Sequence, residues 1–202
     1  MLFSILIFDK PNSASLRDVH RQAHLDYLKT FDDQTLFAGP FTEDDESEDL
    51  GSFRLIDLPN RAAAEKHISD EPYIIEGIQD RWEIYRMSEG LLHSWRDCPR
   101  TAGNIQALFY AIDDRNAADK RAQYQGAHEA YFKEQGDSIM MHGQLLDDAG
   151  HQPIGSVSLL DLPDLDAGYK IMQDEPYCRS GLYAKKLLHR WRFGRVFDRF
   201  KM

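Results

Sequence analysis

The stretch DEPY at residues 70–73 recurs as DEPY at residues 174–177, and this repetition decides the fold. Sliding the chain against itself by 104 residues aligns the two halves without a gap and gives 26 identities over 98 positions. A repeat of this length has the size of one small domain. We therefore predict two copies of one module, residues 1–98 and 105–202, joined by a linker at residues 99–104.

Other identical strings fall in the same register. A residue present in both copies is under a constraint that the copies share, and that constraint is either structural or chemical. The longest further matches are Ala23-His24 with Ala127-His128, Gly51-Ser52 with Gly155-Ser156, and Asp57-Leu58-Pro59 with Asp161-Leu162-Pro163.

The composition is ordinary for a soluble globular protein. Hydrophobic residues make up 42% and charged residues 29% of the chain, and no apolar run approaches the roughly 20 residues that span a bilayer. The opening run at residues 2–8 is typical of a strand rather than a signal peptide, so we expect a cytoplasmic protein without membrane contact. Cys98 and Cys178 occupy non-equivalent positions and predict neither a disulfide framework nor a zinc site.

The formal net charge of −10 arises in the first copy. Residues 1–98 carry 20 acidic and 10 basic side chains, whereas residues 99–202 carry 14 of each. The acidic run at residues 42–49 is typical of a solvated loop between strands. The end of the chain is basic and aromatic, but an acidic protein repels polyanions. Nucleic acid is therefore not an expected partner.

Hydrophobic periodicity predicts the order β-α-β-β-α-β in each copy. This order is typical of the ferredoxin-like fold, an α+β arrangement with both helices on one face of an antiparallel sheet. The continuous apolar first strand predicts that the second copy covers the other sheet face as an intramolecular pseudo-dimer, and further association stays open. The expected strands lie at residues 2–8, 35–41, 51–58, 79–87, 107–112, 139–146, 155–162 and 182–191, and the expected helices at residues 16–31, 60–68, 117–134 and up to 172.

The first helix carries a histidine, His24, beside its apolar stripe, so the ring should point toward the sheet. A lone histidine in such a place is commonly a satisfied core residue. A half-buried imidazole is nevertheless costly unless a partner orients it. The expected stripe consists of Leu16, Val19, Ala23, Tyr27 and Phe31.

Two recurrent pairs are candidates for chemistry, namely His24 with Asp70 and His128 with Asp174. Imidazole paired with carboxylate is the usual arrangement of a general base, because the carboxylate fixes the tautomer and stabilises the protonated ring. Asp70 also has a structural interpretation, since Asp before Glu-Pro can cap a turn or a short helix.

Other recurrent positions are open to two interpretations. Tyr73 can pack or point its hydroxyl into a pocket, and Gly51-Ser52 can mark a close backbone approach or present a hydroxyl to a ligand. His20 and His24 have the i,i+4 spacing of a metal pair, but Tyr124 replaces His20 in the second copy. We expect neither a metal nor a cofactor, because the sequence holds no motif for one.

These residues resemble the YCII (YciI-like) family of small α+β proteins. The resemblance covers nearly all of both copies and implies the ferredoxin-like fold of the dimeric α+β barrel type. It rests on Ala-His in the first helix, Ala-Gly-Pro at residues 38–40, Gly-Ser at residues 51–52, and Asp-Glu-Pro-Tyr at residues 70–73 followed by Gly77.

The resemblance also implies a site. In that family a helix histidine and the aspartate of a DPY-like motif form the catalytic dyad, which corresponds here to the two His-Asp pairs named above. Some members resemble dehydrochlorinases of chlorinated hydroxyhydroquinones, which transfer protons without a cofactor. The family often has an arginine close before the histidine; Arg21 matches it, whereas the second copy has Gln125. The first copy is therefore the better candidate site.

Three functions follow from the sequence. The first is a cofactor-independent lyase or isomerase acting on a small cyclic or aromatic hydroxylated substrate. The second is a module that binds a metabolite without turnover, and the third is a structural protein. For the first function the expected substrate contacts are Arg21, Ser52, Tyr73, Ser156 and Tyr177.

Overall fold

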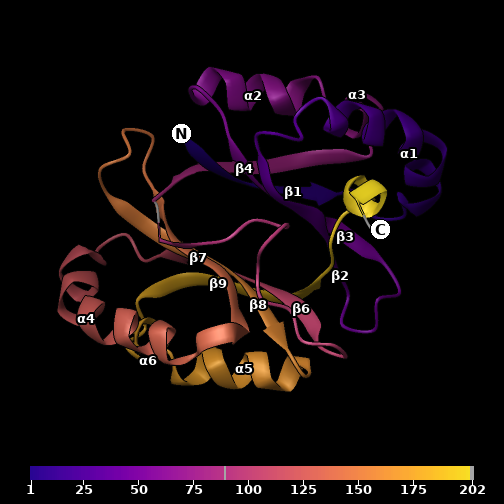
Figure 1. Cartoon of the computed structure of the whole chain (residues 1–202). Coiled ribbons are helices and arrows are strands. Elements are labelled where there is room, and N and C mark those ends of the chain that lie inside the picture. The colour runs from indigo at the N-terminus through magenta and orange to yellow at the C-terminus, as the bar shows by residue number, and fades with distance from the viewer. Residues whose placement is uncertain (89, 201–202) are drawn as a thin grey trace. The chain divides into compact units, whose positions relative to one another are not determined.

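The computed structural model describes residues 1–88 and 90–200, which form two compact units (Figure 1). The first unit, module 1, contains Met1–Met87 and the chain from Arg192 onward, and the second, module 2, is Ser88–Trp191. The α+β class with two ferredoxin-like modules is confirmed. The intramolecular pseudo-dimer stays a prediction.

Module 1 follows the order β-α-β-β-α-β, with a short helix added after the second long helix. Its sheet has the strand order β4-β1-β3-β2 with antiparallel neighbours, and its helices lie on one side of the sheet (Figure 1). The elements are β1 (Leu2–Asp9), α1 (Ala14–Lys29), β2 (Thr35–Thr42), β3 (Asp49–Asp57), α2 (Arg61–Ser69), α3 (Pro72–Ile75), β4 (Gln79–Met87) and a 3-10 helix at Arg195–Phe200.

Module 2 repeats this plan, with the strand order β9-β6-β8-β7-β5. Each long element lies within a few residues of its expected range. The elements are β5 (Leu91–Leu92), β6 (Ile105–Asp113), α4 (Ala118–Glu134), a 3-10 helix at Gly136–Ser138, β7 (Ile139–Leu146), β8 (Pro153–Leu162), α5 (Leu165–Asp174), α6 (Pro176–Arg179) and β9 (Tyr183–Trp191).

The compact units divide the chain differently from the sequence repeat. Leu91 and Leu92 precede the expected linker at residues 99–104, yet they pair with β7 of module 2. At the other end, the backbone N–H groups of Arg192 and Gly194 donate to carbonyls of β2 in module 1, at 3.1 and 2.8 Å. The boundaries 1–98 and 105–202 stay a prediction about the repeat, while these pairings define the compact units.

The helix-facing core of module 1 joins β1 and β3 to α2. Phe3, Ile5 and Ile56 are fully buried there and pack with Ala64 and Ile68 of α2. Burying side chains of this size stabilises a fold by roughly 1.5–3 kcal/mol each. Every helix of residues 1–88 and 90–200 is too short or too polar to span a bilayer.

The apolar stripe expected on α1 is wrong at its N-terminal end. Leu16 is 46% and Val19 is 74% exposed, whereas Arg17 is buried. Toward the sheet, α1 presents a mixed face with two charged or polar side chains, Arg17 and His24, and then Leu28. Polar residues on an inward face need partners, and those partners define the site described next.

Gly51 has a structural reason to recur. A Cβ atom at this position would lie 2.1 Å from the carbonyl oxygen of Ile7 in β1, and at Gly155 it would lie 2.3 Å from that of Ala111 in β6. Such distances are far below van der Waals contact. The Gly-Ser pair therefore marks a close backbone approach, which places Ser52 and Ser156 at matching points of the two sheets.

Candidate active site

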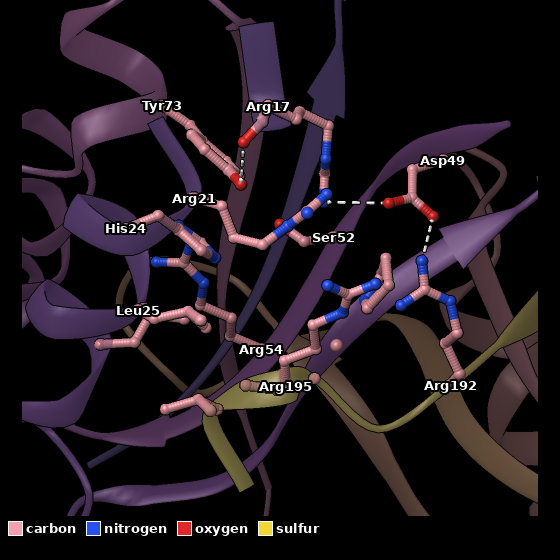
Figure 2. A pocket seen from close by; sticks show the side chains of 16 residues that line it. Arg17, Arg21, His24, Leu25, Asp49, Ser52, Arg54, Tyr73, Arg192 and Arg195 are labelled. Carbon is pink, nitrogen blue, oxygen red and sulfur yellow. Dashed lines mark hydrogen bonds and ion pairs between the residues drawn. The ribbon is translucent and has the colours of Figure 1, made fainter. Parts of the chain in front are cut away.

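One face of α1 forms a wall of a pocket in module 1. Arg17, Arg21, His24 and Leu28 follow one another at spacings of four and three residues, so they lie on the same helix face. All four line the pocket together with residues of β2, β3 and the segment after Arg192 (Figure 2). It encloses about 570 Å³ outside the protein atoms, including its open mouth.

His24 contacts a carboxylate, but this carboxylate is not that of Asp70. Nδ1 of His24 lies 2.7 Å from Oε1 of Glu71, which is fully buried. Asp70 is exposed and pairs with Lys66 on the surface, at 2.6 Å. The predicted partner of His24 is therefore corrected to Glu71.

Local structure explains why Glu71 points inward. Asp70 is the C-cap of α2, and Glu71 is the N-cap of α3, in which Pro72 occupies the first position. The Glu71 carboxylate accepts a hydrogen bond from the backbone N–H of Tyr73, at 3.1 Å. An N-cap side chain folds back over the start of its helix, and here that direction leads to His24.

A buried arginine completes the group. Arg54 of β3 is 2% exposed, and its Nη2 lies 3.2 Å from Oε2 of Glu71. Its Nη1 lies 3.0 Å from Nε2 of His67 in α2. Arg54 thus contacts the second carboxylate oxygen, while His24 contacts the first. A buried carboxylate with a cation and several hydrogen-bond donors can stay ionised.

The pKa values favour ionised Glu71 beside neutral histidines. Burial opposes ionisation of Glu71, but the charge of Arg54 and the hydrogen bond from His24 lower its pKa to about 2. Burial lowers the pKa of His24 more than Glu71 raises it. Burial and the nearby charge of Arg54 lower the pKa of His67 to about 3.

The tautomer of His24 follows from these charges. An ionised carboxylate only accepts hydrogen bonds, so Nδ1 of a neutral His24 carries the proton and donates it to Glu71. Nε2 then has a lone pair open to the pocket, because within residues 1–88 and 90–200 no side chain hydrogen-bonds it. His24 therefore has the arrangement of a general base at a pocket wall.

Tyr73 positions the histidine through its ring. The rings of Tyr73 and His24 are stacked, with centroids 4.0 Å apart and an interplanar angle of 2°. The Tyr73 hydroxyl donates to the backbone carbonyl of Arg17, at 3.0 Å (Figure 2). The hydroxyl therefore engages the helix backbone, while the ring lines the pocket.

Arg17 and two carboxylates fix the other end of the pocket. Arg17 hydrogen-bonds Asp9 of β1, and its Nη2 lies 3.3 Å from Oδ2 of Asp49 in β3. Asp49 also accepts from Nη2 of Arg192, at 2.6 Å (Figure 2). Burial raises the pKa of Asp9, although Arg17 lowers it. Asp49 thus links α1 to the segment after β9.

The remaining predicted contacts of module 1 lie at the pocket. Ser52 is buried, lines the pocket and lies 3.4 Å from Nε2 of Gln79. Arg21 also lines it and pairs with Asp18 one helical turn earlier. The pocket therefore brings Arg21, His24, Ser52 and Tyr73 together and leaves Asp70 outside.

Module 2 has the same pair in a closed setting. Nδ1 of His128 lies 2.6 Å from Oε1 of Glu175, and Tyr177 stacks on the His128 ring with centroids 4.0 Å apart. Asp174 is exposed, so the carboxylate partner of His128 is corrected in the same way. Only 2% of the His128 side chain is exposed, against 12% for His24.

His142 blocks the second ring nitrogen of His128. Nε2 of His142 lies 3.1 Å from Nε2 of His128, and Nδ1 of His142 lies 2.8 Å from Oγ of Ser158. The protons can all be placed, with Ser158 donating to His142, His142 to His128, and His128 to Glu175. In module 1 the matching positions are Ala38 and Arg54.

The hydroxyls of Ser156 and Tyr177 are hydrogen-bonded to other groups of the protein. Ser156 is fully buried and accepts from the Tyr183 hydroxyl, at 2.9 Å. The Tyr177 hydroxyl donates to the backbone carbonyl of Arg121, at 3.2 Å. Among described residues, neither Ser156 nor Tyr177 lines the pocket beside His128. The structure therefore places Ser52 and Tyr73 at a pocket but not their counterparts in module 2.

Sequence reasoning missed several residues of the site. Glu71 recurs as Glu175, Arg17 as Arg121, and Asp9 as Asp113, so the repeat contained a signal for each of them. Arg54 has no counterpart, since the second copy has Ser158 there. Among the described residues, no group of three or more His, Cys, Asp or Glu side chains is arranged to hold a metal ion.

Solved structures with a similar fold match over nearly the full length of this chain. A mutant chlorite dismutase from Candidatus Nitrospira defluvii is 7% identical, with a TM-score of 0.63 over 100% of this chain and 95% of that chain. A heme-binding protein from Thermus thermophilus is 15% identical, with a TM-score of 0.56 over 98% of this chain and 94% of that chain. At these identities the likeness establishes the fold alone.

A 5-chloro-2-hydroxyhydroquinone dehydrochlorinase from Burkholderia phenoliruptrix AC1100, in complex with 2,5-dihydroxybenzoquinone, matches over a shorter span. It is 24% identical, with a TM-score of 0.42 over 45% of this chain and 97% of that chain. No curated protein matches the sequence.

The fold and the paired His-Glu sites define a protein of the dimeric α+β barrel type with two ferredoxin-like modules. The family model of the YCII-related domain matches residues 1–88 and residues 105–192. The chain therefore belongs to the YCII-related domain family and contains that domain twice.

Proposed function

We propose that module 1 is an enzyme site that moves a proton on a small cyclic or aromatic hydroxylated substrate without a cofactor. The observation that carries this proposal is the contact of 2.7 Å between Nδ1 of His24 and Oε1 of Glu71 at the wall of a pocket. The proposed base is His24, and Glu71 replaces Asp70 as the residue that orients it. The resemblance to YCII proteins supports the same class of chemistry.

The proposed step begins with Nε2 of His24 taking a proton from a C–H bond next to a carbonyl or hydroxyl-bearing carbon. The electron pair of that bond moves into the substrate ring system. In an elimination, this pair expels a leaving group from the substrate as an anion, and the His24 imidazolium releases its proton to solvent. In an isomerisation, the pair forms a new C–H bond at another carbon with the proton that the imidazolium returns. Glu71 stabilises the imidazolium while it carries the proton.

Two polar groups support the substrate in this proposal. Ser52 presents a hydroxyl at the pocket that donates to the substrate oxygen on which negative charge develops, and Arg21 binds the substrate at the pocket wall. Fixed donors aimed at developing charge commonly make the largest contribution to rate enhancement. Tyr73 acts on the step through the stacked His24 ring, because its hydroxyl donates to the Arg17 carbonyl.

The test measures solvent deuterium exchange by NMR over a panel of hydroxylated ring compounds and their chlorinated analogues. We expect exchange or elimination with the native chain, and a loss of about 10²–10⁴-fold in His24→Ala, the usual contribution of a general base. Glu71→Gln should also lose activity. Asp70→Asn is the matched control, because Asp70 neighbours Glu71 in sequence but faces solvent.

Two results would contradict the proposal. A hit that turns over equally fast in His24→Ala would remove the histidine from the mechanism. A compound that raises the melting temperature but is recovered chemically intact, without deuterium, would instead support a metabolite-binding module.

A further inference from the structure

The pocket of module 1 is rich in arginine, although this part of the chain is acidic. Five arginines line it, and Asp49 is the one carboxylate that lines it among the described residues. Residues 1–98 carry ten more acidic than basic side chains, from the 20 and 10 counted above. A cationic pocket in an acidic module focuses anions at one place on the protein. The five arginines are Arg17, Arg21, Arg54, Arg192 and Arg195.

Three of these arginines are neutralised within the protein. Arg54 pairs with Glu71, and both side chains are buried. Arg17 hydrogen-bonds Asp9, and Arg192 pairs with Asp49. These ion pairs hold the three guanidinium groups in place. They leave little net positive charge to attract an anionic ligand.

Arg21 and Arg195 differ from the other three. Arg21 pairs with Asp18, which is 66% exposed, so solvent screens this ion pair strongly. Within residues 1–88 and 90–200, no carboxylate lies within ion-pair distance of Arg195. Figure 2 shows both side chains reaching into the pocket, Arg21 from α1 and Arg195 from the segment after β9.

The backbone holds Arg195 at this position. Gly194 donates to the carbonyl of Ala38 at 2.8 Å, and a Cβ atom at Gly194 would lie 2.9 Å from that oxygen. The ion pair between Arg192 and Asp49 fixes the same segment two residues earlier. These contacts fix residues 192–194 and so hold Arg195 at the pocket.

We propose that the pocket of module 1 selects a small ring compound that carries a carboxylate, and that Arg21 and Arg195 bind this group. Guanidinium groups suit this task because they offer paired N–H donors to the two carboxylate oxygens. The apolar wall of Leu25, Leu28 and Val196 receives the ring. The proposal names the substrate class of the proposed enzyme and in that sense rests on it, but its binding test does not require turnover.

The test uses isothermal titration at pH 7.5 with matched pairs of ligands, namely benzoate with benzamide, salicylate with salicylamide, and cyclohexene-1-carboxylate with its amide. We expect at least one carboxylate to bind at least tenfold more tightly than its amide. Arg195→Gln and Arg21→Gln should each remove at least fivefold of that preference. Arg115→Gln, an exposed arginine of module 2, makes the same change in net charge and should leave the affinity unchanged.

Several outcomes overturn the proposal. They are equal binding of acid and amide, no measurable binding of any acid at millimolar concentration, an unchanged preference in Arg195→Gln, and inorganic phosphate competing as well as the best ring acid. The His24→Ala variant separates the two proposals, because carboxylate binding should survive in it. Binding that survives while turnover is absent in the native chain would contradict the enzyme and leave the carboxylate site standing.

Discussion

Nε2 of His142 lies 3.1 Å from Nε2 of His128, the ring nitrogen that the equivalent His24 presents to its pocket. This contact, together with Ser158 in place of Arg54, distinguishes two sites that share the His-Glu pair and its stacked tyrosine. Burial and the neighbouring His128 lower the pKa of His142 to about 3, so this ring stays neutral and keeps donating. In module 2 both ring nitrogens of His128 are therefore hydrogen-bonded to protein side chains. In module 1 Nε2 of His24 faces the pocket instead.

The first prediction exchanges the residue that makes this difference. Ala38→His in module 1 should place an imidazole against His24 and lower turnover or ligand binding at least tenfold, because the base nitrogen is then occupied. The reverse change, His142→Ala, should leave module 1 activity unaltered. Activity in Ala38→His equal to that of the native chain, with folding verified by circular dichroism, would contradict the role assigned to Nε2.

A second prediction concerns the buried carboxylate. Glu71→Gln leaves Arg54 without a counter-charge in a buried position, and breaking a buried pair from one side costs about 3–5 kcal/mol. The amide keeps part of the hydrogen bonding, so we expect the free energy of unfolding to fall by about 2–4 kcal/mol. Urea denaturation measures this loss.

The control for that experiment is Asp70→Asn. Its ion pair with Lys66 is exposed, and exposed pairs contribute about 0–1 kcal/mol. Equal effects of the two substitutions would mean that Glu71 is no more important to the fold than its exposed neighbour.

Much of this fold could be predicted because its signals are local and occur twice. The period of 104 residues fixed the number of modules, and alternating patterns gave the strands to within a few residues. The buried face of α1 is harder to predict. Leu16 and Val19 are apolar but exposed, whereas Arg17 is buried and pairs with Asp9. Hydrophobic periodicity cannot show that a charged residue has a buried partner on another strand.

The site was predicted in part for related reasons. Recurrence identifies His24, but Asp70 and Glu71 both recur, so recurrence does not show which of the two carboxylates faces the histidine. The position of Pro72 offered the better guide, since the residue before the first helical proline is an N-cap whose side chain turns back toward the helix. Arg54 and Arg195 reach the pocket only in the folded chain. Neither has a matching arginine in the other copy, so the repeat gives no signal for them.

A third prediction uses two glycines with opposite surroundings. Gly51→Ala would place a Cβ atom 2.1 Å from the Ile7 carbonyl oxygen, and overpacking of this kind costs about 1–3 kcal/mol or more. Gly126 lies in α4 with nothing within 4 Å of its added Cβ. Gly126→Ala should therefore stabilise the chain by about 0.5–1 kcal/mol. Urea denaturation that showed the same sign for both changes would contradict the close approach of β1 and β3.

The fourth prediction is a loss of stability in acid, and its sign follows from the lowered pKa values. His67 titrates near 6.5 when unfolded and has a pKa of about 3 in the fold. Between these two pKa values the unfolded chain binds more protons than the folded chain does. Lowering the pH therefore stabilises the unfolded state relative to the folded state, and the free energy of unfolding decreases. The stability linked to neutral His67 is present above pH 6.5 and is lost progressively down to about pH 3.

Glu71 adds to this loss at lower pH. Its pKa falls from 4.5 to about 2 in the fold, so its contribution is complete above pH 4.5 and disappears toward pH 2. We expect the urea midpoint to decrease steadily from about pH 7 to about pH 4, because unfolding in this range is coupled to protonation of His67 and His142, whose pKa values are both lowered to about 3 in the fold. His67→Gln, which cannot titrate, should flatten this slope, even if it lowers stability at neutral pH. A slope equal to that of the native chain would show that His67 is not the group whose protonation is coupled to unfolding.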